Sequence, residues 1–198
     1  MSARRCRHHI TNAPQPPGGS WGQEEESMDL KQILRHVPDF PKPGIDFIDI
    51  TTVLQDPAAL KFALDEMGSL LKAFEPFDVI VGPESRGFIF GMPLAYAHGK
   101  GFVPIRKKGK LPAKTIRVEY GLEYGLDVLE IHADAIKPGQ RVLIVDDLLA
   151  TGGTTEANVR LVQQLGGEIV GILYFIELSF LNGRDRLGDF PIRTLVTF

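Results

Sequence analysis

The sequence from Val142 to Thr155 reads Val-Leu-Ile-Val-Asp-Asp-Leu-Leu-Ala-Thr-Gly-Gly-Thr-Thr. Its first four residues are apolar and β-prone, which is typical of a strand buried on both faces of a sheet. Asp146 and Asp147 follow this strand, and a short glycine and threonine loop then leads into a helical pattern. Such a loop offers free backbone N–H groups to a phosphate, and the two carboxylates suit hydroxyl groups or a metal ion. The stretch therefore predicts a site for a phosphorylated sugar at the carboxyl end of a strand.

Other segments repeat the order of strand, loop and helix. Short apolar runs predict strands at 78–82, 102–105, 126–132, 169–176 and 192–196, and helical spacing of apolar residues predicts helices between several of them. Strands that alternate with helices favour an α/β fold with a mostly parallel twisted sheet and flanking helices. Nearer the N-terminus, Leu30, Ile33, Leu34 and Val37 follow helical spacing and predict a helix there.

Composition limits the class of protein. The chain has 198 residues, 43% hydrophobic and 24% charged, which is ordinary for a globular protein with a sizeable core. Its net charge of −3 gives no reason to expect nucleic acid as a partner. We expect no membrane partner, since no apolar run approaches the roughly 18 residues of a membrane helix. Cys6 is the only cysteine, which excludes an intramolecular disulfide and agrees with a cytoplasmic location.

Residues 1–27 differ in composition from the rest. They contain a basic cluster, a proline and glycine stretch and three consecutive glutamates, without hydrophobic periodicity. We interpret this segment as a disordered tail or a non-native extension. Residues 28–198 then form a single domain.

Two further loops carry functional groups. The loop from Glu84 to Gly87 follows a strand, and Arg86 with the loop N–H groups can bind a second anionic group. The segment from Arg106 to Tyr124 is a long connection, rich in lysine and arginine, that could form a lid over an anionic substrate. Short basic runs also occur as solvated surface, and this alternative stays open for the segment. Glu123 stands among tyrosines and glycines in the same connection and is a candidate general acid or base.

The chain resembles the type I phosphoribosyltransferases. The resemblance rests on five motifs, which are Pro43 to Phe47, Ser85 to Phe88, Arg106 to Pro112, Leu122 to Gly125 and Val145 to Thr154. The last motif is similar to the phosphoribosyl-diphosphate motif of the whole family. The runs Arg-Lys-Lys-Gly-Lys-Leu-Pro and Leu-Glu-Tyr-Gly are similar to the adenine-using branch. The resemblance implies the fold of that family, with a small N-terminal hood and a flexible lid loop.

The resemblance also implies a role for each site residue. The 5-phosphate is bound by the loop residues Ala150, Thr151, Gly152, Gly153 and Thr154. Asp146 and Asp147 bind the ribose hydroxyls. Glu84, Ser85 and Arg86 face the diphosphate, with a cis peptide expected between Glu84 and Ser85. Arg106, Lys107 and Lys110 reach the diphosphate of a partner subunit, which implies a homodimer.

The purine site is implied in the same way. Phe47 and Leu148 sandwich the purine ring, and backbone groups near Asp46 and Ile48 read its edge. Ile48 departs from the arginine that many family members carry at this place. Glu123 contacts the imidazole side of the purine and takes or relays its proton.

The implied reaction is purine salvage, in which adenine and phosphoribosyl diphosphate give AMP and diphosphate. Mg²⁺ is the implied cofactor, held mainly by the substrate diphosphate rather than by protein ligands. Two alternatives remain at this point. One is a salvage enzyme for hypoxanthine, guanine or xanthine. The 6-oxo group of these purines accepts a hydrogen bond at the place where the amino group of adenine donates one. The other is a non-catalytic phosphoribosyl-diphosphate sensor, although residues 1–40 are too short for a winged helix.

Overall fold

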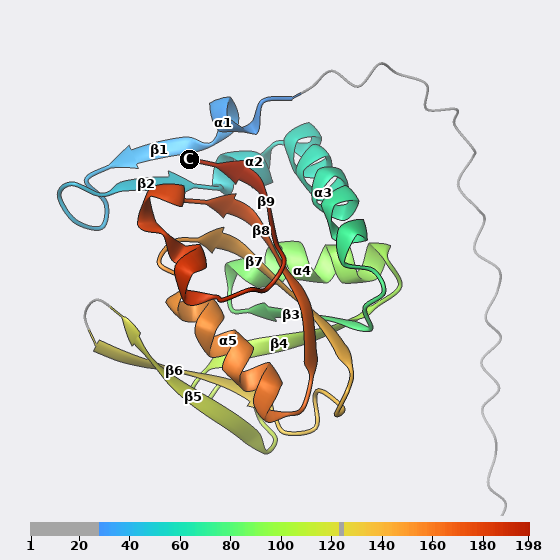
Figure 1. Cartoon of the computed structure of the whole chain (residues 1–198). Coiled ribbons are helices and arrows are strands. Elements are labelled where there is room, and N and C mark those ends of the chain that lie inside the picture. Colours follow the sequence, from blue (N-terminus) through green and yellow to red (C-terminus); the bar gives the residue numbers. More distant parts are fainter. Residues whose placement is uncertain (1–27, 123–124) are drawn as a thin grey trace, which may run out of the picture.

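The structure, a computed structural model, describes residues 28–122 and 125–198 (Figure 1). The tail expected at residues 1–27 lies outside the described residues. A seven-stranded sheet forms the centre of the fold. Across the sheet the strands run β5 (Thr115–Leu122), β6 (Gly125–His132), β4 (Gly101–Lys107), β3 (Val79–Pro83), β7 (Arg141–Leu149), β8 (Glu168–Glu177) and β9 (Ile192–Thr197). The five strands from β4 to β9 in this order are parallel, which confirms the expected sheet.

Helices cover both faces of the sheet. Helices α3 (Pro57–Leu71) and α4 (Arg86–Ala97) cover one face, and α5 (Gly153–Gln164) covers the other (Figure 1). Strand β7 shows how the sequence supports these layers. Its residues Leu143 and Val145 pack in the core beneath α3 and α4, whereas Val142 and Ile144 pack in the cores beneath α5. The continuous apolar run therefore serves a strand that is buried on both faces, as predicted.

The N-terminal part of the described chain forms a small hood. It consists of α1 (Leu30–Ile33), the antiparallel strands β1 (Arg35–Pro38) and β2 (Asp46–Asp49), and α2 (Thr51–Gln55). The helix expected to extend to Val37 is wrong, because α1 ends at Ile33 and Val37 pairs with Phe47 across the two strands. The described part of the chain also contains 3₁₀ turns at Lys72–Phe74 (η1), Ser179–Leu181 (η2) and Gly183–Arg186 (η3).

Part of the segment expected to be a lid is regular structure. Residues Thr115–Leu122 form β5, which pairs antiparallel with β6 along its whole length. Arg106 and Lys107 belong to β4, where they pair with β6. The loop that remains between β4 and β5 covers residues 108–114.

The order of the strands creates a switch point between β3 and β7. These strands are adjacent and parallel, but the helices that follow them lie on opposite faces of the sheet. The loops at their carboxyl ends therefore diverge, and this edge of an open α/β sheet is where ligands bind. Among the described helices, none is long and apolar enough to cross a membrane.

Candidate functional site

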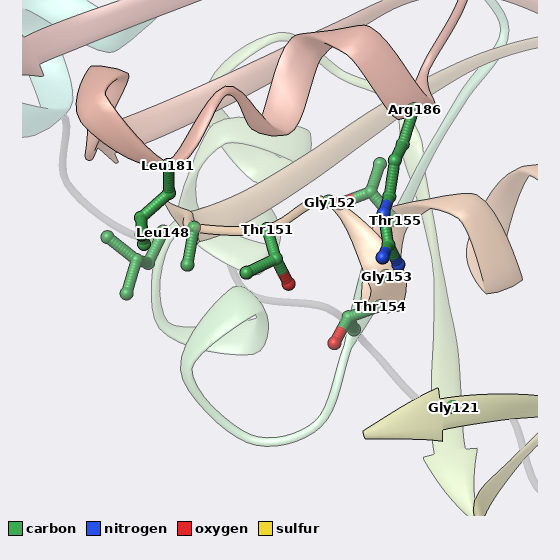
Figure 2. Close-up of a pocket in the computed structure, with 10 residues that line it drawn as sticks. Gly121, Leu148, Thr151, Gly152, Gly153, Thr154, Thr155, Leu181 and Arg186 are labelled. Atoms are coloured by element: carbon green, nitrogen blue, oxygen red, sulfur yellow. The ribbon is translucent and has the colours of Figure 1, made fainter. Parts of the chain in front are cut away.

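A cavity of about 750 Å³ lies over the loop after β7 (Figure 2). It is lined by Gly121, Leu148, Ala150, Thr151, Gly152, Gly153, Thr154, Thr155, Leu181 and Arg186. The structure thus brings together every residue of the loop that the sequence predicted to bind a phosphate.

The loop has the backbone geometry of an anion site. Gly152 has φ of 82°, in the left-handed region that favours glycine, and α5 begins at the next residue. The N-terminal N–H groups of a helix have no intrahelical partner and carry the positive end of its dipole. Figure 2 shows the hydroxyl oxygens of Thr151 and Thr154 on the same open side of the loop. Backbone donors and hydroxyls therefore converge where a phosphate group fits.

The two aspartates lie inside β7 rather than beyond its end, and both are buried. The Asp147 backbone N–H donates to Asp146 Oδ1 over 2.8 Å. Burial raises the pKa of Asp146 well above its usual value, and the neighbouring charge of Asp147 raises this pKa further. Burial also raises the pKa of Asp147, although the Arg86 guanidinium opposes that shift.

Arg86 connects the two loops of the switch point. Its Nε lies 2.9 Å from Asp147 Oδ2, and its guanidinium carbon lies 5.7 Å from the ring centroid of Phe47. The preceding peptide, between Glu84 and Ser85, is cis, as the resemblance implied. Arg106 is near as well, since its Nε donates to Glu84 Oε2 over 2.6 Å. Two arginines therefore adjoin the loop that was predicted to face a diphosphate.

Asp147 retains unused capacity to accept hydrogen bonds. Although Arg86 is within ion-pair distance, Oδ2 of Asp147 is buried and accepts no aligned hydrogen bond from residues 28–122 or 125–198. In folded proteins, the large majority of buried carboxylate oxygens accept at least one hydrogen bond from protein or ordered water. An oxygen of this kind suits a ligand hydroxyl or a cation that arrives with the ligand.

The remaining basic residues are placed differently. Lys107 Nζ lies 3.1 Å from Asp127 Oδ2, and the hydrogen bond to Asp127 raises the pKa of Lys107. Lys110 is exposed in the loop after β4. Glu123, the candidate acid or base, lies outside the described residues.

The predicted purine contacts are divided between two places. Leu148 lines the loop cavity, whereas Phe47 lies beside Arg86 and is not among the described residues that line it. Asp46 and Ile48 line a second cavity of about 410 Å³, which shares Leu181 with the first. There Asp46 Oδ2 lies 2.6 Å from His36 Nδ1, and the Ile48 side chain is buried in the core.

Arg186 and Leu181 line the loop cavity, and the sequence analysis missed both. They belong to the 3₁₀ turns between β8 and β9, which show no hydrophobic periodicity. Arg184 and Arg186 flank an aspartate, but a short charged run in a connection gives no sign of the loop that it will face.

Within residues 28–122 and 125–198, no group of three or more histidine, cysteine, aspartate or glutamate side chains is arranged to hold a metal ion. Mg²⁺ commonly uses one or two carboxylates together with substrate phosphates rather than an all-protein cage. The buried acceptor oxygen of Asp147 fits that kind of binding.

Comparisons with known proteins agree on one family. A model of the phosphoribosyl transferase domain matches residues 54–187. A protein of Acetivibrio thermocellus named adenine phosphoribosyltransferase is 70% identical over 171 residues, which are 86% of this chain and all of the relative. The crystal structure of the adenine phosphoribosyltransferase of Thermoanaerobacter pseudethanolicus superposes with a TM-score of 0.80 at 54% identity, covering 85% of this chain and 98% of that one.

A second similar structure contains ligands. The Saccharomyces cerevisiae adenine phosphoribosyltransferase was solved with an imino-altritol bisphosphate and adenine. It is 44% identical to this chain, with a TM-score of 0.80, and the match covers 84% of this chain and 96% of the yeast chain.

Proposed function

The chain belongs to the phosphoribosyltransferase family and, within it, to the adenine phosphoribosyltransferases, and from this membership we propose how its residues divide the work. The enzyme transfers the 5-phosphoribosyl group to adenine and so forms AMP by purine salvage. The observation that carries the site assignment is the buried Oδ2 of Asp147 near the phosphate loop, which pairs in charge with Arg86 but accepts no aligned hydrogen bond from the described residues.

We propose that the sugar end of the substrate lies along β7 and its loop. Ala150 to Thr154 bind the 5-phosphate through backbone N–H groups and threonine hydroxyls, and Asp146 and Asp147 accept from the ribose hydroxyls. The hydroxyl of the substrate supplies the donor that Asp147 Oδ2 lacks among the described residues. This placement also leaves the anomeric carbon facing the loop after β3.

The diphosphate end is assigned to that second loop. Arg86, with the Glu84–Ser85 turn, and Arg106 hold the diphosphate in an arrangement that favours the charge it develops on leaving. Mg²⁺, when bound with the diphosphate, supplies further positive charge to this leaving group. Its protein ligands would be carboxylates of the Asp146–Asp147 pair, while the substrate provides most of its contacts. Lys107 and the exposed Lys110 add positive charge from β4 and its loop.

The purine is assigned to the space between Phe47 and Leu148. Displacement at the anomeric carbon develops positive charge on the sugar ring, as in glycoside chemistry. Glu123 contacts the purine and takes its proton as the ring nitrogen attacks. Arg86, which is assigned to the diphosphate, lies over the ring of Phe47, so the base site and the diphosphate site adjoin at this arginine.

The first test of this function is a purine competition assay. We expect AMP from adenine and phosphoribosyl diphosphate, with kcat/KM for hypoxanthine, guanine and xanthine lower by about 10⁴-fold, because unpaired polar groups in the base site penalise a 6-oxo ring strongly. Chelation of Mg²⁺ with EDTA is expected to reduce the rate by orders of magnitude, and excess Mg²⁺ should restore it. A preference for any 6-oxo purine would contradict the base assignment.

We propose that the enzyme is a homodimer that acts in the cytoplasm. On α4, Ile89, Met92 and Tyr96 follow helical spacing, and the Tyr96 side chain is 84% exposed. An apolar row on one helix face usually marks an interface. The basic residues of β4 and its loop follow this helix directly in the chain. A second copy on this face would bring Lys110 near the diphosphate loop of its partner.

The dimer is tested by replacing two residues of this row. The double variant Met92→Glu and Tyr96→Glu is expected to elute as a monomer in size-exclusion chromatography with light scattering, because it places four like charges in a two-fold interface. Lys137→Glu, in an exposed turn, is the control and should remain dimeric. A wild-type monomer, or a dimeric double variant, would rule out this interface.

A further inference from the structure

The phosphate loop lacks a cation of its own. Its sequence from Ala150 to Thr155 contains no lysine or arginine, whereas P-loops carry a lysine at the corresponding place. Backbone donors and the helix dipole supply only partial charges. A phosphate monoester near neutral pH carries close to two negative charges, so a full positive charge from elsewhere in the chain would strengthen the site.

Arg186 occupies the position from which that charge can be supplied. It lines the loop cavity, and Figure 2 shows its guanidinium extending toward Gly153 and Thr154. A Cβ built on Gly153, the first residue of α5, would lie 3.6 Å from Nη1 of Arg186. The guanidinium therefore stands over the helix N-terminus where the phosphate is proposed to bind. Arginine is well matched to phosphate because its planar fork can donate two parallel hydrogen bonds.

The neighbouring arginine has a different role. Arg184 donates to both carboxylate oxygens of Glu177, with Nε and Nη2 each 2.6 Å from an oxygen, and Nη2 also donates to Thr194. The hydrogen bonds from Arg184 are the main cause of a lowered pKa for Glu177. By contrast, no ion pair joins Arg186 to a carboxylate anywhere in the described residues. Arg184 thus fixes the turn η3 to β8, and the guanidinium of Arg186 remains available to a ligand.

Backbone contacts fix η3 on its other side. A Cβ on Gly183 would lie 2.2 Å from the Ala150 carbonyl oxygen, and a Cβ on Gly152 would lie 2.5 Å from the Gly183 carbonyl oxygen. The backbone of η3 therefore packs directly on the phosphate loop. Because both sides of the turn are held, the backbone of η3 places Arg186 beside the phosphate loop before a ligand arrives, which reduces the reorganisation needed on binding.

We propose that Arg186 is a binding residue for the 5-phosphate and supplies the full positive charge that the loop lacks. This inference rests on the proposed placement of the phosphoribosyl group. The competing explanation is that Arg186 is a solvated arginine near Glu119 and Glu156, which line a smaller adjoining cavity with it. Glu156 already pairs with Arg160, which weakens that explanation.

The test compares AMP with adenosine, which differ by the phosphate alone. Arg186→Gln is expected to weaken AMP binding by about 10–100-fold and to leave adenosine binding unchanged, as titration calorimetry can measure. In steady state the KM for phosphoribosyl diphosphate should rise by a similar factor with little change in kcat. Arg186→Lys should recover part of the affinity, because a lysine restores the charge without the fork.

Arg193→Gln is the matched control, since this exposed arginine lies on the edge strand β9 opposite Leu173 of β8, and it is not among the described residues that line the loop cavity. It should bind AMP as the wild type does. Unchanged AMP affinity in Arg186→Gln, or equal losses for AMP and adenosine, would overturn the role proposed for Arg186 and leave the proposed function standing. A wild-type protein that forms no AMP would instead overturn the proposed function.

Discussion

Replacing Glu123 with alanine is expected to lower kcat by about 10²–10⁴-fold, the range typical of a lost general acid or base. The same variant should bind phosphoribosyl diphosphate within about threefold of wild type, because the sugar and diphosphate contacts come from other loops. Single-turnover kinetics measures the first quantity, and calorimetry with phosphoribosyl diphosphate measures the second. This combination separates a residue that acts on the purine from one that holds the sugar.

A second substitution distinguishes the two roles open to Glu123. Glu123→Gln keeps a hydrogen-bonding side chain but loses the ability to accept a full proton. A true base predicts that glutamine is as inactive as alanine, whereas an orienting group predicts substantial rescue. Glu168→Gln, at the amino end of β8 and far from the carboxyl edge of the sheet, is the control and should retain wild-type turnover. Full activity in Glu123→Ala would eliminate any catalytic role.

Substitution of the paired aspartates Asp146 and Asp147 gives the second large effect. Substrate binding is expected to weaken, whereas the stability of the folded protein is expected to rise in one of the two variants. Asp147→Asn is expected to weaken the binding of phosphoribosyl diphosphate by about 10–100-fold, because hydrogen bonds to a charged partner contribute roughly 1.5–3 kcal/mol. Asp146→Asn should weaken it as well. Yet Asp146→Asn should stabilise the ligand-free protein near pH 8, since it removes a buried charge next to another. The asparagine oxygen can still accept from the Asp147 backbone N–H.

The pH dependence of this stability gain has a definite sign. Burial and the charge of Asp147 raise the pKa of Asp146 above its value in the unfolded chain. The folded wild-type protein therefore binds a proton at pH values where the unfolded chain is still ionised, and its stability falls as pH rises through the folded-state pKa. The advantage of Asp146→Asn should shrink as pH is lowered.

Thermal unfolding at several pH values checks this expectation. Asp134→Asn, an exposed aspartate in the turn after β6, is the control and should change neither stability nor affinity. Wild-type affinity for phosphoribosyl diphosphate in Asp147→Asn would refute the ribose assignment. A less stable Asp146→Asn protein at high pH would show that its carboxylate contributes more than its burial removes.

The parts of the fold that the sequence predicted are those in which local pattern and tertiary environment agree. The apolar run of β7 is continuous because both of its faces are covered, so the pattern reports the environment directly. The glycine and threonine loop was predicted for a similar reason, since its backbone chemistry depends little on distant residues. The start of α3 shows the same agreement, since aspartate followed by proline is typical of a helix start and the Asp56 side chain accepts from the backbone N–H groups of Ala58 and Ala59.

Two errors of local interpretation have identifiable causes. The spacing of Leu30, Ile33, Leu34 and Val37 fits a helix, but pairing with β2 outweighs the weak preference of so short a segment. The strand β5 was included in the expected lid because it continues a segment that is rich in lysine and arginine. Its sequence Thr-Ile-Arg-Val-Glu-Tyr alternates apolar and polar residues, and this period of two is the signal that could have identified it.

The candidate site was only partly predictable for a different reason. Residues that follow a strand can be assigned to one edge of the sheet from sequence, and this reasoning found Arg86 and the phosphate loop. Arg186 lies on a 3₁₀ turn, and the position of this turn depends on the Arg184–Glu177 ion pair and on the close approach of the η3 backbone to the phosphate loop. Neither contact has a local sequence pattern, so only the structure reveals it.

The contact between the phosphate loop and η3 also limits how this sequence can vary. Any side chain at Gly183 would press against the Ala150 carbonyl, and any side chain at Gly152 would press against the Gly183 carbonyl while forcing an unfavourable φ. A substitution at either glycine therefore displaces the loop and the turn together. These two segments are far apart in the chain, but a substitution in one is tolerated only if the other can adjust. A design that changes the phosphate loop must therefore change η3 as well.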